Sequence, residues 1–188
     1  MRINYVIMLS LCFLFAFFGC ATKEQPDNTA QSTGASVDNV SQVIKVERRP
    51  NFAPNFSWKD KSGNTKSLDS YKGNITFVNF WATWCGPCKH ELPDLIELSK
   101  EFSNNKVTFI GVSVDRGPNI IDDVRAFVKE REVPYQNVLA SDEMVEAYGN
   151  VRAIPTSFLI NGEGKIVQTY IGIRSKEFLA GSIRSILN

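Results

Sequence analysis

Residues 75–88 read ITFVNFWATWCGPC, a mostly apolar run that ends in two cysteines separated by two residues. The segment 75–80 has the length and composition of a strand that is buried on both faces of a sheet. Residues 86–102 then show the apolar spacing of a helix, and Pro93 inside it is expected to kink it. The cysteine pair is therefore predicted at a strand-to-helix junction.

Cys85 and Cys88 have the spacing of a redox-active dithiol. Cys85 falls at the helix N-terminus, where unpaired N–H groups and the macrodipole favour its thiolate. Cys88, three residues later, lies on the same helical face within reach of a disulfide. Pro87 fits the first helical turn, where its missing N–H costs nothing.

Other uses of such a pair fit less well. A zinc site needs four ligands, and beyond residue 20 the chain offers only these two cysteines and His90. Covalent haem attachment needs a histidine directly after the second cysteine, where Lys89 stands. A purely structural disulfide would close a very small loop and gain little entropy. We therefore predict thiol–disulfide chemistry without a metal or an organic cofactor.

Strands and helices alternate along the rest of residues 51–188. Turn signals at 61–64 and 161–164 indicate two hairpins. The expected strands are 55–58, 65–68, 107–114, 156–160 and 165–170, and the expected helices are 120–130, 142–148 and 175–187. On the last helix, the predicted apolar face comprises Phe178, Leu179, Ile183, Ile186 and Leu187. This order predicts an α/β fold with a mixed central sheet flanked by helices.

The first 19 residues have the pattern of a signal peptide. Arg2 precedes an apolar run from Tyr5 to Gly19, which is short for a membrane-spanning helix. The pair Gly19-Cys20 resembles a bacterial lipobox, which implies lipidation of Cys20 and attachment to a bacterial membrane. The alternative is an uncleaved anchor, and either interpretation exports the domain.

Residues 20–50 are predicted to be the lipidated cysteine and a flexible tether, and residues 51–188 the folded domain. The stretch 21–51 holds no aromatic residue and is rich in polar ones, although residues 43–46 are a candidate short strand. Arg2 is the only charged residue before residue 20, so the rest of the chain carries no net charge. This balance gives no electrostatic reason to expect binding to nucleic acid.

The segments Trp84-Cys85-Gly86-Pro87-Cys88 and Arg152-Ala153-Ile154-Pro155-Thr156 resemble the active-site sequence and the cis-proline loop of the thioredoxins. Pro93 falls where those proteins kink the active-site helix. The resemblance implies a thioredoxin fold and a cis bond before Pro155. It also implies substrate binding by Trp84, Pro87, Ile154 and Pro155, with Ile154 offering its backbone.

From residue 51 onward the chain is most similar to the TlpA/ResA-like branch of that superfamily. The segment 53–73 resembles the N-terminal β-hairpin of the branch, and Pro155 stands 67 positions after Cys88, which leaves room for its inserted helix and strand. Asn79 replaces the buried acid of the thioredoxins. Glu91 matches an acidic residue near the branch's active site, so we expect it to take the proton from Cys88. The alternative is an ordinary solvated glutamate.

This resemblance implies an enzyme, a protein thiol–disulfide oxidoreductase working outside the cytoplasm on the periplasmic side. Its partners would be disulfide-bearing exported proteins, as in cytochrome c maturation, and a membrane thiol electron donor. We expect a monomer that reduces its partners. Three alternatives remain: a dithiol oxidase or isomerase, a peroxiredoxin-like peroxidase, and a tethered binding module without catalysis. The peroxidase pattern is not met, because Thr83 stands two residues before Cys85 instead of three.

Overall fold

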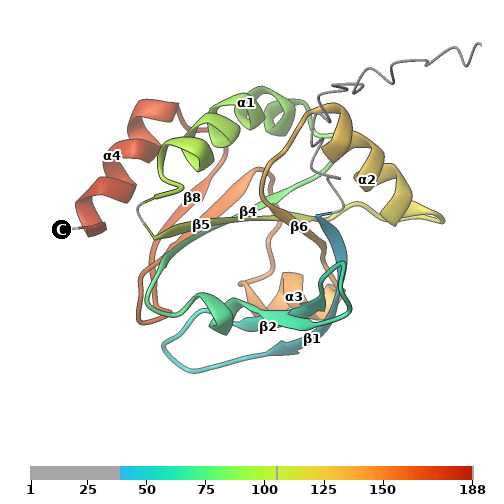
Figure 1. The fold of residues 1–188 in the computed structure, drawn as a ribbon, viewed down its shortest axis with the longest axis horizontal. Coiled ribbons are helices and arrows are strands. Elements are labelled where there is room, and N and C mark those ends of the chain that lie inside the picture. The colour runs from blue at the N-terminus through green and yellow to red at the C-terminus, as the bar shows by residue number, and fades with distance from the viewer. Residues whose placement is uncertain (1–38, 105, 188) are drawn as a thin grey trace, which may run out of the picture. The chain divides into compact units, whose positions relative to one another are not determined.

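A computed structural model describes residues 39–104 and 106–187. Within these residues, eight strands form one sheet in the order β3-β2-β1-β6-β5-β4-β7-β8 (Figure 1). The strands are β1 (Val40–Glu47), β2 (Asn55–Lys59), β3 (Thr65–Ser67), β4 (Ile75–Trp81), β5 (Val107–Ser113), β6 (Gln136–Leu139), β7 (Thr156–Ile160) and β8 (Ile166–Ile171). The helices are the 3-10 turn η1 (Leu68–Tyr71), α1 (Gly86–Glu101), α2 (Ile120–Glu130), α3 (Asp142–Ala147) and α4 (Lys176–Leu187).

Strand β4 forms the centre of the fold. It pairs in parallel with β5 and antiparallel with β7, and all of its side chains are buried. Successive side chains of a strand point to opposite faces, so Phe77 and Val78 belong to different layers of the core. This two-sided burial is the reason that residues 75–81 are almost continuously apolar.

Helices cover both faces of this central region. Leu95 of α1 and Ile183 of α4 join Phe77 in one apolar cluster, while Met144 of α3 and Phe56 of β2 join Val78 in another. Figure 1 shows the same arrangement, with α1 and α4 on one side of β4 and β5, and α3 on the other side with β1 and β2. The predicted mixed sheet flanked by helices is therefore confirmed.

The connections of the predicted fold are also present. Strands β2 and β3 form an N-terminal hairpin, and α2 and β6 lie between α1 and the loop that contains Pro155. Helix α1 runs from Gly86 to Glu101 with Pro93 inside it. None of the helices in the described ranges is long and apolar enough to cross a membrane.

Strand β1 lies inside the stretch that the sequence assigned to the tether. It pairs in parallel with β6 and antiparallel with β2, and Val40, Val43 and Val46 enter the core. The register shifts between Val43 and Lys45, which leaves Ile44 exposed. A bulge of this kind breaks the alternation that marks a strand in a sequence. The boundary predicted at residue 51 is therefore too late for the start of the folded chain.

The apolar face predicted for α4 is only partly correct. Leu179 and Ile183 are buried, but Phe178 is 49% exposed and Leu187 36%. The Phe178 ring packs edge-on against Tyr170 at 5.5 Å between centroids, so it covers the rim of the core instead of filling it.

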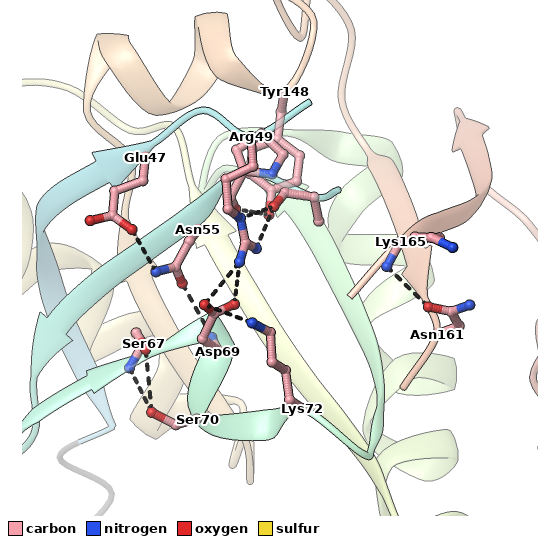
Figure 2. A network of polar contacts seen from close by, with 12 residues as sticks. Glu47, Arg49, Asn55, Ser67, Asp69, Ser70, Lys72, Tyr148, Asn161 and Lys165 are labelled. Carbon is pink, nitrogen blue, oxygen red and sulfur yellow. Dashed lines mark hydrogen bonds and ion pairs between the residues drawn. The ribbon is translucent and has the colours of Figure 1, made fainter. Parts of the chain in front are cut away.

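A polar network fastens β1 to the β2–β3 hairpin. Arg49 Nη1 donates to both carboxylate oxygens of Asp69, at 2.6 and 2.8 Å. Its Nε and Nη2 donate to the carbonyl of Ala53, and the Tyr148 hydroxyl donates to the carbonyl of Pro54 at 3.0 Å. Figure 2 shows Arg49 lying between this connection and Asp69. The hairpin is thus tied to α3 and to the core below it.

Candidate active site

Connections from four strands meet at one edge of the sheet. The parallel strands β4 and β5 end there, since Trp81 pairs with Ser113. The antiparallel strand β7 begins there and β8 ends there, since Thr156 pairs with both Phe80 and Ile171. In open α/β sheets, ligands bind outside the carboxyl ends of the parallel strands. This edge is the one at which the predicted site residues fall.

The cysteine pair sits where β4 passes into α1. The Cys85 N–H donates to the Ala82 carbonyl at 3.2 Å, which closes a tight turn before the helix. Cys85 is the N-cap of α1, and the Cys88 N–H donates to its Sγ at 3.1 Å. A disulfide joins Cys85 to Cys88, and both are buried, whereas Trp84 in the turn is 67% exposed. The helix N-terminus and this N–H favour a negative charge on Cys85.

The proline loop faces this sulfur. The Ile154–Pro155 peptide bond is cis, as the resemblance implied. The Ile154 carbonyl oxygen lies 3.8 Å from Cys85 Sγ. A disulfide sulfur carries no proton, so a hydrogen bond at this contact requires the reduced thiol. The Pro155 carbonyl accepts from the Gly172 N–H at 2.8 Å, which fixes the loop to the end of β8.

Glu91 lies one helical turn after Cys88 and is only 2% exposed. Its Oε1 accepts from the Arg174 N–H at 2.9 Å, and its Oε2 has no partner among the described residues. Burial raises the pKa of Glu91, against the opposing effects of the Arg174 N–H and of the charge on Arg174. A buried carboxyl with one free oxygen and a raised pKa has the properties of a proton acceptor. An ordinary solvated glutamate is excluded.

Asp115 is a further buried carboxylate at this edge, and the sequence analysis did not single it out. It lies two residues after the end of β5, and it accepts hydrogen bonds from Thr83 and Ser113. Its place just after an apolar stretch predicted to be a buried strand is the signal in the sequence that could have identified it. His90, by contrast, is exposed on α1, as expected of a surface residue.

A groove of about 370 Å³ opens beside the proline loop. Its apolar lining includes Tyr148, Val151 and Phe158, and Ile171 of β8 stands exposed at it. Within the described residues, no cluster of three or more His, Cys, Asp or Glu side chains is arranged to hold a metal ion. The arrangement can therefore carry thiol–disulfide exchange next to an apolar surface.

Comparison with known proteins agrees with this geometry. The sequence profile of the AhpC/TSA family matches residues 50–169. The chain belongs to the AhpC/TSA family. Among the proteins similar to this chain is the thiol–disulfide oxidoreductase ResA of Bacillus cereus, 34% identical over 134 residues, which are 71% of this chain and 76% of ResA. The predicted enzyme class, a thiol–disulfide oxidoreductase with a ResA-like domain, is confirmed.

Two solved structures extend the comparison of this AhpC/TSA member. A thiol:disulfide interchange protein of the thioredoxin family from Chlorobium tepidum superposes with a TM-score of 0.66, at 32% identity over 76% of this chain and 99% of that one. The pneumococcal exposed lipoprotein thioredoxin from Streptococcus pneumoniae gives 0.60, at 29% identity over 70% and 98%. The predicted thioredoxin fold is therefore confirmed. Cys20 lies outside the described residues.

Proposed function

We propose that the protein is a membrane-tethered, extracytoplasmic reductase of disulfides in partner proteins. The observation that carries this proposal is the placement of Cys85 at the N-cap of α1, against the cis-proline loop, with the buried Glu91 one helical turn after Cys88. This placement supplies an attacking thiolate, a surface for the partner and an acceptor for the second proton.

The reaction is two thiol–disulfide exchanges. The Cys85 thiolate attacks one sulfur of a partner disulfide and forms a mixed disulfide, and the other partner sulfur leaves as a thiolate that takes up a proton. Glu91 then accepts the proton of Cys88, and the Cys88 thiolate attacks Cys85 Sγ. The second partner thiolate leaves, and the Cys85–Cys88 disulfide forms. Two electrons have passed to the partner, and a membrane thiol carrier restores the dithiol.

Reduction of a partner disulfide by stoichiometric reduced protein tests this mechanism. Cys85→Ser should abolish the reaction, and Cys88→Ser should accumulate the mixed disulfide. Glu91→Gln should slow release of the partner by about tenfold or more, because a general base contributes at least that factor. Attack by Cys88 in the absence of Cys85, or a faster reaction with hydrogen peroxide than with disulfides, would refute the proposal.

Because the chain resembles the TlpA/ResA-like branch, cytochrome c maturation is the process that we propose to test first. The probe is a peptide that holds a C-x-x-C-H segment as a disulfide. The matched control peptide has the same two cysteines in a scrambled sequence. Preferential reduction of the first peptide supports this partner, and equal rates argue for a general reductase.

Lipid attachment at Cys20 is proposed from the pair Gly19-Cys20, with support from the pneumococcal relative that is described as an exposed lipoprotein. Cys20→Ser should abolish incorporation of labelled palmitate and change the fractionation of the protein, while the reduction of disulfides stays unchanged. Wild-type processing and fractionation of this variant would contradict the anchor.

A further inference from the structure

Asp115 carries a carboxylate that is only 3% exposed and accepts hydrogen bonds from three donors, all of them neutral. The Thr83 N–H lies 3.2 and 3.0 Å from its two oxygens, and the Thr83 hydroxyl donates to Oδ1 at 2.7 Å. The Ser113 hydroxyl donates to Oδ2 at 2.7 Å. None of the ion pairs in the described part of the chain includes Asp115. Burying a carboxylate without a cation costs free energy. Without these hydrogen bonds, the buried Asp115 carboxylate would destabilise the fold.

These bonds reach the turn that presents Cys85. The β4–β5 ladder ends where the Val114 N–H donates to the Trp81 carbonyl at 2.8 Å. Beyond β4, the Asp115 carboxylate accepts from the N–H of Thr83, the first central residue of the turn from Ala82 to Cys85. Asp115 therefore fixes one central residue of this turn, and the other, Trp84, projects into solvent.

The charge of Asp115 acts on the same turn from Ala82 to Cys85. Thr83 is separated from Cys85 by one residue, so the Asp115 carboxylate is bonded to the same turn that carries the sulfur that must become a thiolate. Like charges disfavour one another, and this effect opposes that of the helix N-terminus. The Arg116 guanidinium is held by the Val114 and Asp115 carbonyls and by the Asp142 carboxylate.

The other charged groups near the pair come from α1, from the proline loop, where Arg152 is exposed, and from the loop after β8. Lys89 and His90 are exposed on the first turn of α1. Glu91 is buried against the Arg174 N–H. These groups are shared by the wild type and by every variant below, so a difference between variants reports on the Asp115 carboxylate.

We propose that Asp115 is a positioning residue of the redox turn. It holds Thr83, and through it the Cys85 sulfur, in line with the Ile154 carbonyl, and its charge limits the stability of the Cys85 thiolate. The proposal rests on Cys85 being the attacking cysteine, as set out under the proposed function.

The test is Asp115→Asn, which keeps the shape but removes the charge and turns one oxygen into a donor. Two quantities are measured: the rate of disulfide reduction, and the pH midpoint of Cys85 alkylation in a Cys88→Ser background. We expect the rate to fall about tenfold, as for the loss of one charged hydrogen bond. We expect the midpoint to move down by about one unit, because a like charge has been removed.

Ser113→Ala is the matched control, since it removes the hydroxyl that donates to Asp115 Oδ2 and accepts from the Asp115 N–H, but leaves the charge and the Thr83 contacts. It should keep the midpoint of the wild type and change the rate less than about twofold. An unchanged midpoint in Asp115→Asn, with a rate that falls only with the folded fraction, would show a merely structural role and overturn the proposal.

If Asp115→Asn does not fold, Thr83→Val tests the positioning role instead. This variant loses only the 2.7 Å side-chain bond, so we expect a rate about two- to fivefold lower at an unchanged midpoint. A wild-type rate in a folded Thr83→Val protein would overturn the proposal.

Cys85→Ser separates this proposal from the proposed function. If Cys85→Ser retains activity, the proposed function fails. If Cys85→Ser is inactive and Asp115→Asn is unaffected, only the positioning role of Asp115 is refuted.

Discussion

Arg49→Met is expected to destabilise the domain strongly although the residue lies far from the cysteines in the sequence. The arginine side chain is 21% exposed and its partner Asp69 31%. Three guanidinium nitrogens are engaged, one by Asp69 and two by the carbonyl of the fully buried Ala53 (Figure 2). Methionine keeps most of the apolar stem and removes every donor.

The size of the effect follows from what is left behind. Asp69 retains Lys72 at 3.1 Å and some contact with solvent, so losing the arginine there should cost about 1–2 kcal/mol. The Ala53 carbonyl loses its donors inside the protein, which costs about 1–3 kcal/mol. A total of about 2–5 kcal/mol corresponds to a melting temperature lower by about 5–20 °C for a domain of this size. Thermal unfolding followed by far-UV circular dichroism measures it.

Arg48→Met is the matched control. The neighbouring arginine pairs with Glu146 at 2.9 Å, and both side chains are more than half exposed. Such a surface pair is worth about 0–1 kcal/mol, so its melting temperature should change by only about a few degrees or less. Equal shifts in melting temperature for the two variants, or an Arg49→Met protein as stable as the wild type, would refute the conclusion that this network stabilises the attachment of the hairpin.

Three other substitutions test separate parts of the structure. Glu91→Gln should gain stability relative to the wild type as the pH rises from 4 to 7. A carboxyl whose pKa is raised by burial stabilises the fold below its ordinary pKa and loses this contribution as the pH passes the folded-state value, so urea titrations across this range should diverge. Gly111→Ala should cost about 1–3 kcal/mol in the same assay, because its Cβ would fall 2.0 Å from Asn137 Oδ1. Tyr148→Phe should cost about 1–2 kcal/mol by leaving the buried Pro54 carbonyl without its donor, and an unchanged midpoint would show that water replaces the hydroxyl.

The core of the fold could be predicted because its signals are local. The buried strand at 75–81 and the apolar spacing after Cys85 depend only on neighbouring residues, and the structure places both as expected. Strand β1 is different, since its burial depends on β6 and β2 and its bulge at Ile44 breaks the alternation. Phe178 shows the same limit, because only the packing of α4 on Tyr170 decides how much of its ring is covered.

The candidate site could be predicted to a similar extent. The spacing of Cys85 and Cys88 and the loop at Pro155 are readable in the sequence, and the fold brings them together. The burial of Glu91 was not readable, since it depends on the Arg174 N–H from the other end of the domain. The contact between Asp115 and the redox turn likewise needs the alignment of β4 with β5.

The place of β1 in the middle of the sheet bears on the order in which the chain folds as it emerges. Its partner β6 follows it by more than ninety residues, since Val40 pairs with Asn137. During synthesis or export from the N-terminus, β1 therefore emerges well before β6, the strand with which it pairs in parallel. Contacts so distant in sequence slow folding, and an unpaired strand is a template for the wrong partner. Chains that emerge close together are thus most exposed to mispairing through β1, and a chaperone that covers residues 40–47 would act at the step where the domain is most vulnerable.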